Sequence, residues 1–332
     1  MLEIKDLVVR YRTGNLLSRL KPGAVRYVDI LAGVSLHVAP GKTLGLIGES
    51  GSGKTTLGRA VIGLTPISGG TVQVNGRQPR DASDWSWRGI RRDTGLIFQD
   101  PMAALDPRMC VEKLVTEPFS VNGREINRRE AAGRLLSMVG LPAAFIDRYP
   151  HQLSGGQARR VAVALRPKLI IADEPTTGLD LSVQGELLNL LTALQRELGM
   201  SYLIITHNLA ITRHVTDDIA IMYLGRIVES GPTAALFRAP AHPYTAALLS
   251  AKGSGGESGK GVLVGEIPTL SHRPAGCEFH TRCPQAQARC RVDVPLLRPL
   301  AGGQHVACHF PLHRAALSPA RSGAIIFKET HA

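Results

Sequence analysis

Apolar positions along this chain follow two patterns, one that alternates with polar positions and one that runs unbroken for a few residues. Residues 2–10 alternate, which predicts a strand at the edge of a sheet, and residues 30–38 predict a second strand. Residues 219–223 and 225–228 suggest a hairpin. Short apolar runs predict buried strands at 43–47, 95–98, 169–172 and 202–205, the last two of the parallel type.

Helical patterns lie between these strands. Residues 182–198 are amphipathic, and residues 125–139 predict a helix that stops at Gly140-Leu141-Pro142. Because residues 108–165 are mostly helical, the chain runs from antiparallel strands to α/β units interrupted by a helical insertion. The predicted fold class is therefore α/β, with an antiparallel β subdomain and a helical subdomain at about residues 100–165.

Composition predicts the domain boundaries. Residues 1–252 form one large domain, and residues 253–261 (GSGGESGKG) have the composition of a flexible linker. Residues 262–313 form a small extension that contains four cysteines. Residues 314–332 form a tail without a strong pattern.

Net charge indicates which kinds of partner the chain could bind, and hydropathy indicates whether it could span a membrane. The 332 residues carry a net charge of +12, which suits nucleic acid, anionic lipid or an acidic partner. Basic residues gather at 10–26, either as a solvated loop or as a loop near lipid headgroups. Nucleic acid ranks lower because no recognition helix or aromatic-rich RNA motif is found. No run of about 18 apolar residues predicts a membrane span, and the N-terminus lacks a signal-peptide pattern, so we expect a cytosolic chain.

A glycine-rich loop, GESGSGKT at residues 48–55, lies between the apolar run at 43–47 and a stretch of helical composition. In this context glycines turn backbone N–H groups toward a polyphosphate, and lysine reaches the β- and γ-phosphates. The Thr55 hydroxyl can hold Mg²⁺. The expected ATP-binding residues are Gly48, Ser50, Gly51, Ser52, Gly53, Lys54, Thr55 and Thr56.

Polar residues end the next two apolar runs. Asp173 and Glu174 follow the run at 169–172, where Asp173 can hold Mg²⁺ and Glu174 can polarise a water in line with the γ-phosphate. His207 follows the run at 202–205. A histidine at a strand end is often structural, but here it can hydrogen-bond the γ-phosphate and orient the water.

A second phosphate cradle is predicted at Leu153-Ser154-Gly155-Gly156-Gln157, where a hydroxyl and glycine N–H groups open a helix. This stretch resembles the signature of the ABC ATPases, P-loop NTPases in which the signature of one subunit covers the ATP of another. The resemblance covers residues 2 to about 250. It implies that Gln99 contacts Mg²⁺ and water, that residues 177–180 form the D-loop, and that Tyr11 stacks on adenine.

Further motifs resemble the ATPases of oligopeptide and dipeptide importers, and nickel importers share much of the pattern. The motifs are FQDP at 98–101, ALDP at 104–107, HPYT at 242–245, CEFH at 277–280 and RCP at 282–284. The resemblance implies a second ATPase subunit, more often a paralogue, two membrane permease subunits and an external solute-binding protein. It places the chain peripherally on the cytoplasmic face of the membrane, with no nucleic acid partner.

The cysteines of the extension are separated by five, six and seventeen residues, unlike the short spacing of a common zinc knuckle. Cys277, Cys283, Cys290 and Cys308 can hold zinc or an iron–sulfur cluster, or remain reduced thiols in a small core. The resemblance favours a four-iron–four-sulfur cluster. Spare candidate ligands are His280, His305 and His309.

One stretch departs from the family pattern. Between the signature and the acidic pair, residues 158–168 lack about four residues, close to one helical turn. This is a tolerated deletion, a subunit with one weakened site, or a defective variant. Two other functions compete with an importer ATPase: a soluble ABC protein that acts on nucleic acid, and a non-catalytic nucleotide-dependent scaffold.

Overall fold

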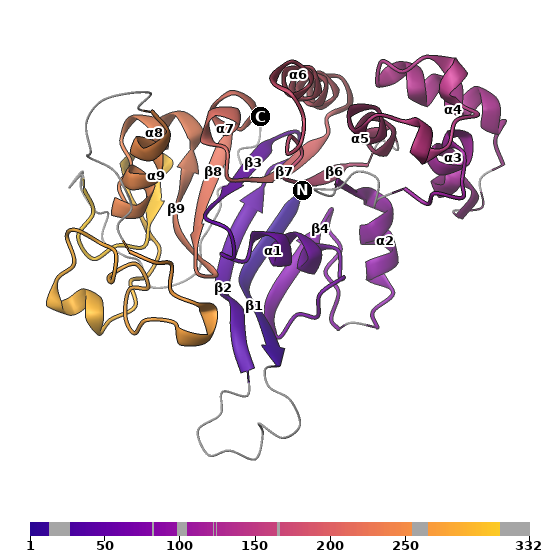
Figure 1. The fold of residues 1–332 in the computed structure, drawn as a ribbon. Helices are drawn as coiled ribbons and strands as arrows, with labels where there is room; N and C mark the ends of the chain where they lie inside the picture. The colour runs from indigo at the N-terminus through magenta and orange to yellow at the C-terminus, as the bar shows by residue number, and fades with distance from the viewer. Residues whose placement is uncertain are drawn as a thin grey trace.

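Two β-sheets carry the fold of the computed structural model, which describes residues 1–12, 27–81, 83–97, 105–121, 123, 125–164, 167–253 and 265–312 (Figure 1). The smaller sheet has three strands in the order β2-β1-β4. The larger sheet has eight, in the order β10-β11-β9-β8-β3-β7-β6-β5. The strands are β1 (Leu2–Arg12), β2 (Tyr27–Val38), β3 (Thr43–Ile47), β4 (Gly69–Val74), β5 (Thr94–Ile97), β6 (Leu169–Asp173), β7 (Ser201–Thr206), β8 (Asp218–Tyr223), β9 (Arg226–Pro232), β10 (Arg298–Pro299) and β11 (His305–Val306).

Helices cover the sheets and fill one side of the molecule. They are α1 (Lys54–Val61), α2 (Ser86–Asp93), α3 (Val111–Val121), α4 (Arg128–Met138), α5 (Gly155–Val163), α6 (Leu181–Leu198), α7 (Leu209–Val215), α8 (Thr233–Arg238) and α9 (Pro243–Gly253). Short 3₁₀ turns are η3 (Ala143–Phe145), η4 (Pro150–Gln152), η5 (Leu270–His272), η6 (Ala288–Arg291) and η7 (Ala301–Gly303). None of the helices in the described ranges is long and apolar enough to cross a membrane.

The centre of the larger sheet is parallel. β3 pairs with β7 and β8, and β6 pairs with β5 and β7, all in parallel register. β3 and β7 are buried along their whole length, which explains why their sequences show apolar runs rather than alternation. The buried strands predicted at 43–47, 169–172 and 202–205, the helix at 182–198 and the hairpin of β8 with β9 are confirmed. The strand predicted at 95–98 is present as β5, but it ends the sheet and is only partly buried.

The first strand corrects one expectation. The alternation at residues 2–10 predicted an edge strand, but β1 is the middle strand of its sheet and pairs with both β2 and β4. Its alternate residues Leu2, Ile4, Leu7 and Val9 are buried on one face. Alternation therefore reported the single buried face correctly, but it carries no information on how many neighbours a strand has.

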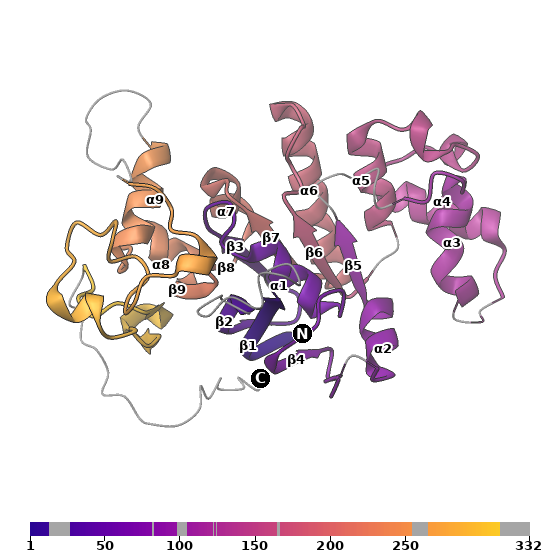
Figure 2. The same ribbon diagram turned by 60° about the horizontal axis from the view of Figure 1, so that its bottom comes forward.

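Helices α3, α4 and α5 lie together at one side of the larger sheet, away from the C-terminal segment, in both views (Figures 1 and 2). Their buried apolar residues form one cluster with residues of β6, β7 and α6, which joins this helical region to the sheet. α4 begins after Asn127, whose side chain accepts a hydrogen bond from the Glu130 N–H. The helix expected at 125–139 thus starts three residues later than predicted.

Residues 265–312 fold back against the larger sheet. β11 pairs with β9, and β10 pairs with β11, so this segment extends the sheet beyond the β8–β9 hairpin. A third apolar cluster joins it to the hairpin through Tyr223, Tyr244 and Phe279. These two-residue strands have no pattern in the sequence, and the sequence analysis did not predict them.

Candidate functional site

Three central strands deliver the predicted site residues to one edge of the sheet. Gly48 follows β3, Asp173 ends β6, and His207 follows β7, because parallel strands present their carboxyl ends on the same side. They surround a cavity of about 750 Å³. The sequence-predicted residues that line it are Tyr11, Gly48, Ser50, Gly51, Gly53, Lys54, Thr55, Thr56, Asp173, Glu174 and His207. Ser52 lies beneath them, 3% exposed.

The backbone of the loop at 48–55 depends on glycine at two positions. A Cβ at Gly48 would collide with the carbonyl oxygen of Met222, so only glycine lets the loop approach β8 this closely. Gly53 has a φ of 103° and leads directly into α1. Lys54, Thr55 and Thr56, the residues that open α1, line the cavity, and the start of a helix suits an anion.

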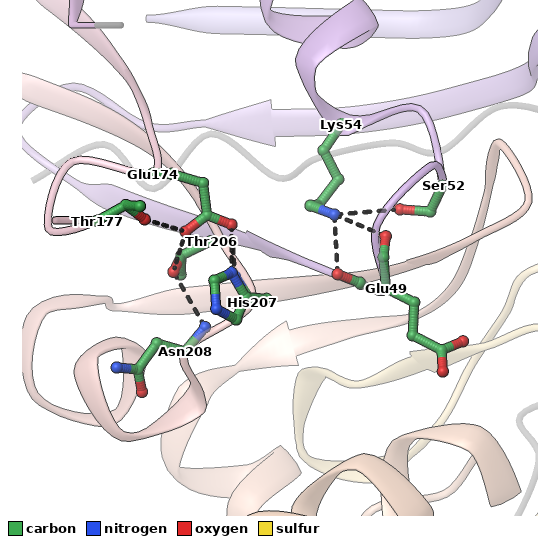
Figure 3. Close-up of polar contacts among 9 residues, drawn as sticks. Glu49, Ser52, Lys54, Glu174, Thr177, Thr206, His207 and Asn208 are labelled. Atoms are coloured by element: carbon green, nitrogen blue, oxygen red, sulfur yellow. Dashed lines mark hydrogen bonds and ion pairs between the residues drawn. The ribbon is translucent and has the colours of Figure 1, made fainter. Parts of the chain in front are cut away.

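Lys54 is held by the loop itself. Its Nζ donates to the carbonyl oxygens of Gly48 and Glu49, both at 2.8 Å, and contacts Ser52 Oγ at 3.4 Å (Figure 3). Burial lowers the pKa of Lys54, while the nearby carboxylates of Glu174 and Asp173 oppose that shift. The arrangement fixes one cation at the cavity wall, where it can meet phosphate oxygens.

Asp173 and Thr55 face one another across the base of the cavity. Burial raises the pKa of Asp173, and a hydrogen bond from the Thr55 side chain opposes the shift. A carboxylate and a hydroxyl are oxygen donors of the kind that Mg²⁺ prefers, so the residues present fit this ion. Gln99, the third predicted Mg²⁺ contact, lies outside the described residues.

Glu174 and His207 form a direct pair. His207 Nδ1 lies 2.7 Å from Glu174 Oε1, and the His207 backbone N–H donates to the same oxygen at 3.0 Å (Figure 3). Thr206 Oγ1 donates to Oε2 at 3.3 Å. Because an ionised carboxylate only accepts, Nδ1 carries the proton in this contact, and Nε2 of a neutral ring is then an acceptor.

The backbone at Glu174 is unusual. Its φ of 51° places a non-glycine residue in the left-handed region, a conformation that costs about 1 kcal/mol or more. The Glu174 N–H donates to the Ile205 carbonyl at 2.8 Å, which anchors this turn to β7. The turn directs the carboxylate toward His207 rather than along the strand.

The wall opposite the loop includes residues that sequence reasoning missed. The predicted Tyr11, 42% exposed, lines the cavity together with three residues that were not predicted, Ile30, Leu248 and Leu270. Leu248 comes from α9 and Leu270 from η5, far along the chain from any nucleotide motif. Their apolar character suits the flat face of a base, but isolated leucines give no signal that could have identified them.

The signature residues lie elsewhere. Ser154 caps α5 by accepting from the Gln157 N–H at 3.3 Å, and Gln157 Oε1 accepts from the Ser154 N–H at 3.0 Å. None of the described residues that line the cavity comes from Ser154–Gln157. Ser154 is exposed, and Gly155 and Gly156 are partly exposed, so this helix start faces outward.

The four cysteines of the extension surround one small space. Cys277, Cys283, Cys290 and Cys308 line a cavity of about 10 Å³, room for about one water molecule. Within the described ranges, no group of three or more His, Cys, Asp or Glu side chains is arranged to hold a metal ion. The thiols are chemically suited to a cluster, but their present spacing does not accommodate one.

The spare histidines are divided between different surroundings. His309 lines the same cavity as the cysteines, and its Nε2 contacts the Asp293 carbonyl at 2.9 Å. The Nδ1 of His280 contacts the Cys277 carbonyl at 2.9 Å. His305 lines a separate cavity between the two sheets, away from the thiols.

Two family models match the chain. Residues 31–177 match the model described as ABC transporter, and residues 228–290 match the model described as oligopeptide/dipeptide transporter, C-terminal region.

Named relatives match most of the chain. It is 44% identical over 286 residues to a putative peptide import ATP-binding protein of Brucella abortus. That match covers 83% of this chain and 85% of the relative. It is 41% identical over 311 residues to the oligopeptide transport ATP-binding protein OppF of Escherichia coli, covering 90% and 92%. Among solved structures, a dimeric ATP-binding cassette in a post-hydrolysis state bound to ADP and Pi is 28% identical, with a TM-score of 0.61. That match covers 70% of this chain and 99% of the cassette.

Proposed function

The chain belongs to the ABC transporter ATPase family, and we propose that it is the ATP-hydrolysing subunit that energises an importer of dipeptides or oligopeptides. The observation that carries this proposal is the single cavity in which the Glu174–His207 pair shares a wall with Lys54. Relatives named for peptide import support the substrate class, as does the match of residues 228–290. Nickel or another small solute is the alternative cargo.

The residues divide the reaction between binding and water activation. Lys54 and the N–H groups of residues 48–55 bind the β- and γ-phosphates, and Tyr11 stacks on adenine. Glu174 accepts a hydrogen bond from the attacking water and takes its proton as the new oxygen–phosphorus bond forms at the γ-phosphate. The bond from that phosphorus to the bridging oxygen breaks in the same displacement, and ADP leaves. Gln99 takes part at the same water and at Mg²⁺. When bound, Mg²⁺ neutralises phosphate charge, and Thr55 and Asp173 would hold it.

His207 changes its hydrogen bond during the cycle. In the present contact its Nδ1 proton is committed to Glu174, so Nε2 of the neutral ring cannot donate to a phosphate. Donation to the γ-phosphate therefore requires the ring to shift its proton or to take up a second one. Moving the proton from Nδ1 to Nε2 would end the ring's donation to Glu174 Oε1, whereas a doubly protonated ring would keep it.

The outward-facing signature gives this subunit a second task. Ser154, Gly155, Gly156 and Gln157 would cover the ATP held by the phosphate loop of another ATPase subunit, which we propose is a paralogue. Two permease subunits and an external solute-binding protein complete the importer, and the chain sits peripherally on the cytoplasmic face of the membrane. In this division residues 1–252 are the nucleotide-binding domain, 253–261 a linker, 262–313 the cysteine extension and 314–332 a tail.

The cysteine extension is proposed to hold a four-iron–four-sulfur cluster, with zinc as the alternative. Support comes from the four thiols that line one cavity. Binding requires those thiols to move apart from their present positions. Anaerobic purification followed by iron and sulfide assays tests this idea, and colourless protein with stoichiometric zinc would overturn it.

Reconstitution tests the main proposal. The full chain is assembled with its permease subunits and partner ATPase in vesicles, with the solute-binding protein outside, and ATP hydrolysis is followed together with uptake. We expect a dipeptide or oligopeptide library to stimulate both. Stimulation by nickel without a response to peptides would replace the cargo, and an assembled complex without ATPase activity would refute the catalytic role.

A further inference from the structure

The phosphate loop is held by two side chains from the C-terminal part of the chain. The Glu49 backbone N–H donates to Tyr244 Oη at 3.1 Å, across 195 positions of sequence. The Glu49 carboxylate accepts from Arg282 Nη1 at 2.7 Å and from Nη2 at 3.0 Å, across 233 positions. Both the backbone and the side chain of one loop residue are therefore fixed by residues outside the nucleotide motifs.

The ion pair is shielded from water. The Arg282 side chain is 4% exposed and the Glu49 side chain 20%. The Arg282 guanidinium lies 5.9 Å from the centre of the Tyr223 ring, whose neighbours are Tyr244 at 4.8 Å and Phe279 at 5.4 Å. A bidentate pair seated in a packed aromatic cluster fixes direction as well as distance, unlike a surface ion pair.

Glu49 transmits this constraint to the lysine that binds phosphate. The Glu49 carbonyl oxygen accepts from Lys54 Nζ at 2.8 Å, while its carboxylate points away from Lys54 (Figure 3). One residue thus joins Arg282 on one side to Lys54 on the other. Without Arg282, an uncompensated carboxylate would lie in the loop that receives a polyphosphate, and like charges would oppose binding.

We propose that Arg282 and Tyr244 are positioning residues for the phosphate loop, so that the C-terminal segment sets the affinity of this chain for ATP. The inference rests on the proposed function, because it concerns the same nucleotide site. It gives the cysteine extension a direct connection to that site, since Arg282 lies between Cys277 and Cys283 on the same short stretch.

The test measures the dissociation constant of the full chain for a fluorescent ATP analogue. Arg282→Gln is expected to weaken binding about 10-fold, and Arg282→Lys, which keeps charge but loses the fork, by an intermediate amount. Tyr244→Phe, which removes only the hydroxyl, should weaken binding about threefold. Arg273→Gln is the matched control, because Arg273 is also a poorly exposed arginine of this segment but pairs with Glu278 at 3.2 Å.

A double-mutant cycle separates positioning of the loop from loss of the fold. Glu49→Gln combined with Arg282→Gln should bind no more weakly than Arg282→Gln alone, because both changes remove one interaction. The proposal is overturned if the two losses add, if Arg282→Gln binds like the wild type, or if Arg273→Gln loses as much affinity as Arg282→Gln. Absence of ATP binding by the wild type would instead refute the proposed function.

Discussion

The phosphate-loop cavity and the signature helix differ in how much of their site this chain supplies. In the cavity, Lys54 is held by its own loop, and Glu174, which follows β6, is held by His207, which follows β7. At the start of α5, Ser154 and Gln157 satisfy each other and face outward. The first region is a nearly complete site, whereas the second has the form of a surface made for another molecule.

A buried contact connects the two regions. Arg159, on α5, is 2% exposed and donates from Nη2 to the Thr177 carbonyl at 2.8 Å. Thr177 in turn contacts Glu174 Oε2 at 3.5 Å and lines the cavity. The signature helix is therefore connected to the Glu174 carboxylate within the chain, before any partner is considered.

The contrast between the cavity and the signature helix predicts its largest effect at Glu174. Glu174→Gln keeps the size of the side chain but removes the base, so turnover of the assembled complex should fall about 1,000-fold while ATP binding persists. Glu186→Gln, at an exposed α6 residue that pairs with Arg160 at 2.9 Å, serves as the control and should leave turnover unchanged. If Glu174→Gln and the wild type hydrolyse ATP equally, the cavity is not the catalytic site.

The next largest effect is expected at Lys54. Lys54→Ala removes the cation that meets the phosphates, and ATP should bind about 100-fold more weakly by calorimetry. Lys42 is a matched control, because it flanks the other end of β3 and pairs with Asp217 at 2.8 Å. Equal losses for Lys42→Ala and Lys54→Ala would mean that the strand, rather than the loop, determines binding.

A smaller effect is expected at the signature. Ser154→Ala should leave ATP binding by the isolated chain within about twofold of the wild type, but reduce turnover of the assembled complex about 10-fold. Because Ser154 also caps α5, Asn127→Ala provides the control: it removes the cap of α4 without touching the signature. If the isolated Ser154→Ala chain binds ATP more weakly than the wild type, the signature contributes to this chain's own ATP site and the two regions do not differ as described.

The smallest effect is expected from the shortened connection after α5. Inserting Ala-Arg-Ala-Leu after Leu165 would restore about one helical turn between the signature and β6. If the signature is displaced, turnover of the assembled complex should rise several-fold, because small misplacements carry large rate penalties. An unchanged rate would show that this deletion is tolerated.

Sequence reasoning correctly predicted which strand ends meet at one edge of the sheet. The loop at 48–55 and the acidic pair at 173–174 each follow an apolar run, and parallel strands necessarily bring such ends together. It failed for Arg282, whose partner Glu49 lies 233 positions away. An arginine next to a cysteine has no pattern that points to a phosphate loop, so only the folded contact identifies it.

The pairing of β11 with β9 also affects what happens when the chain is shortened. A chain that ends before residue 265 would leave the outer side of β9 with unpaired N–H and C=O groups, an open template for other chains. In the full chain the sheet instead ends in β10, a strand of two residues that includes Pro299. Trimming the extension would therefore promote aggregation, and a poor yield of such a protein should not be attributed to a missing metal.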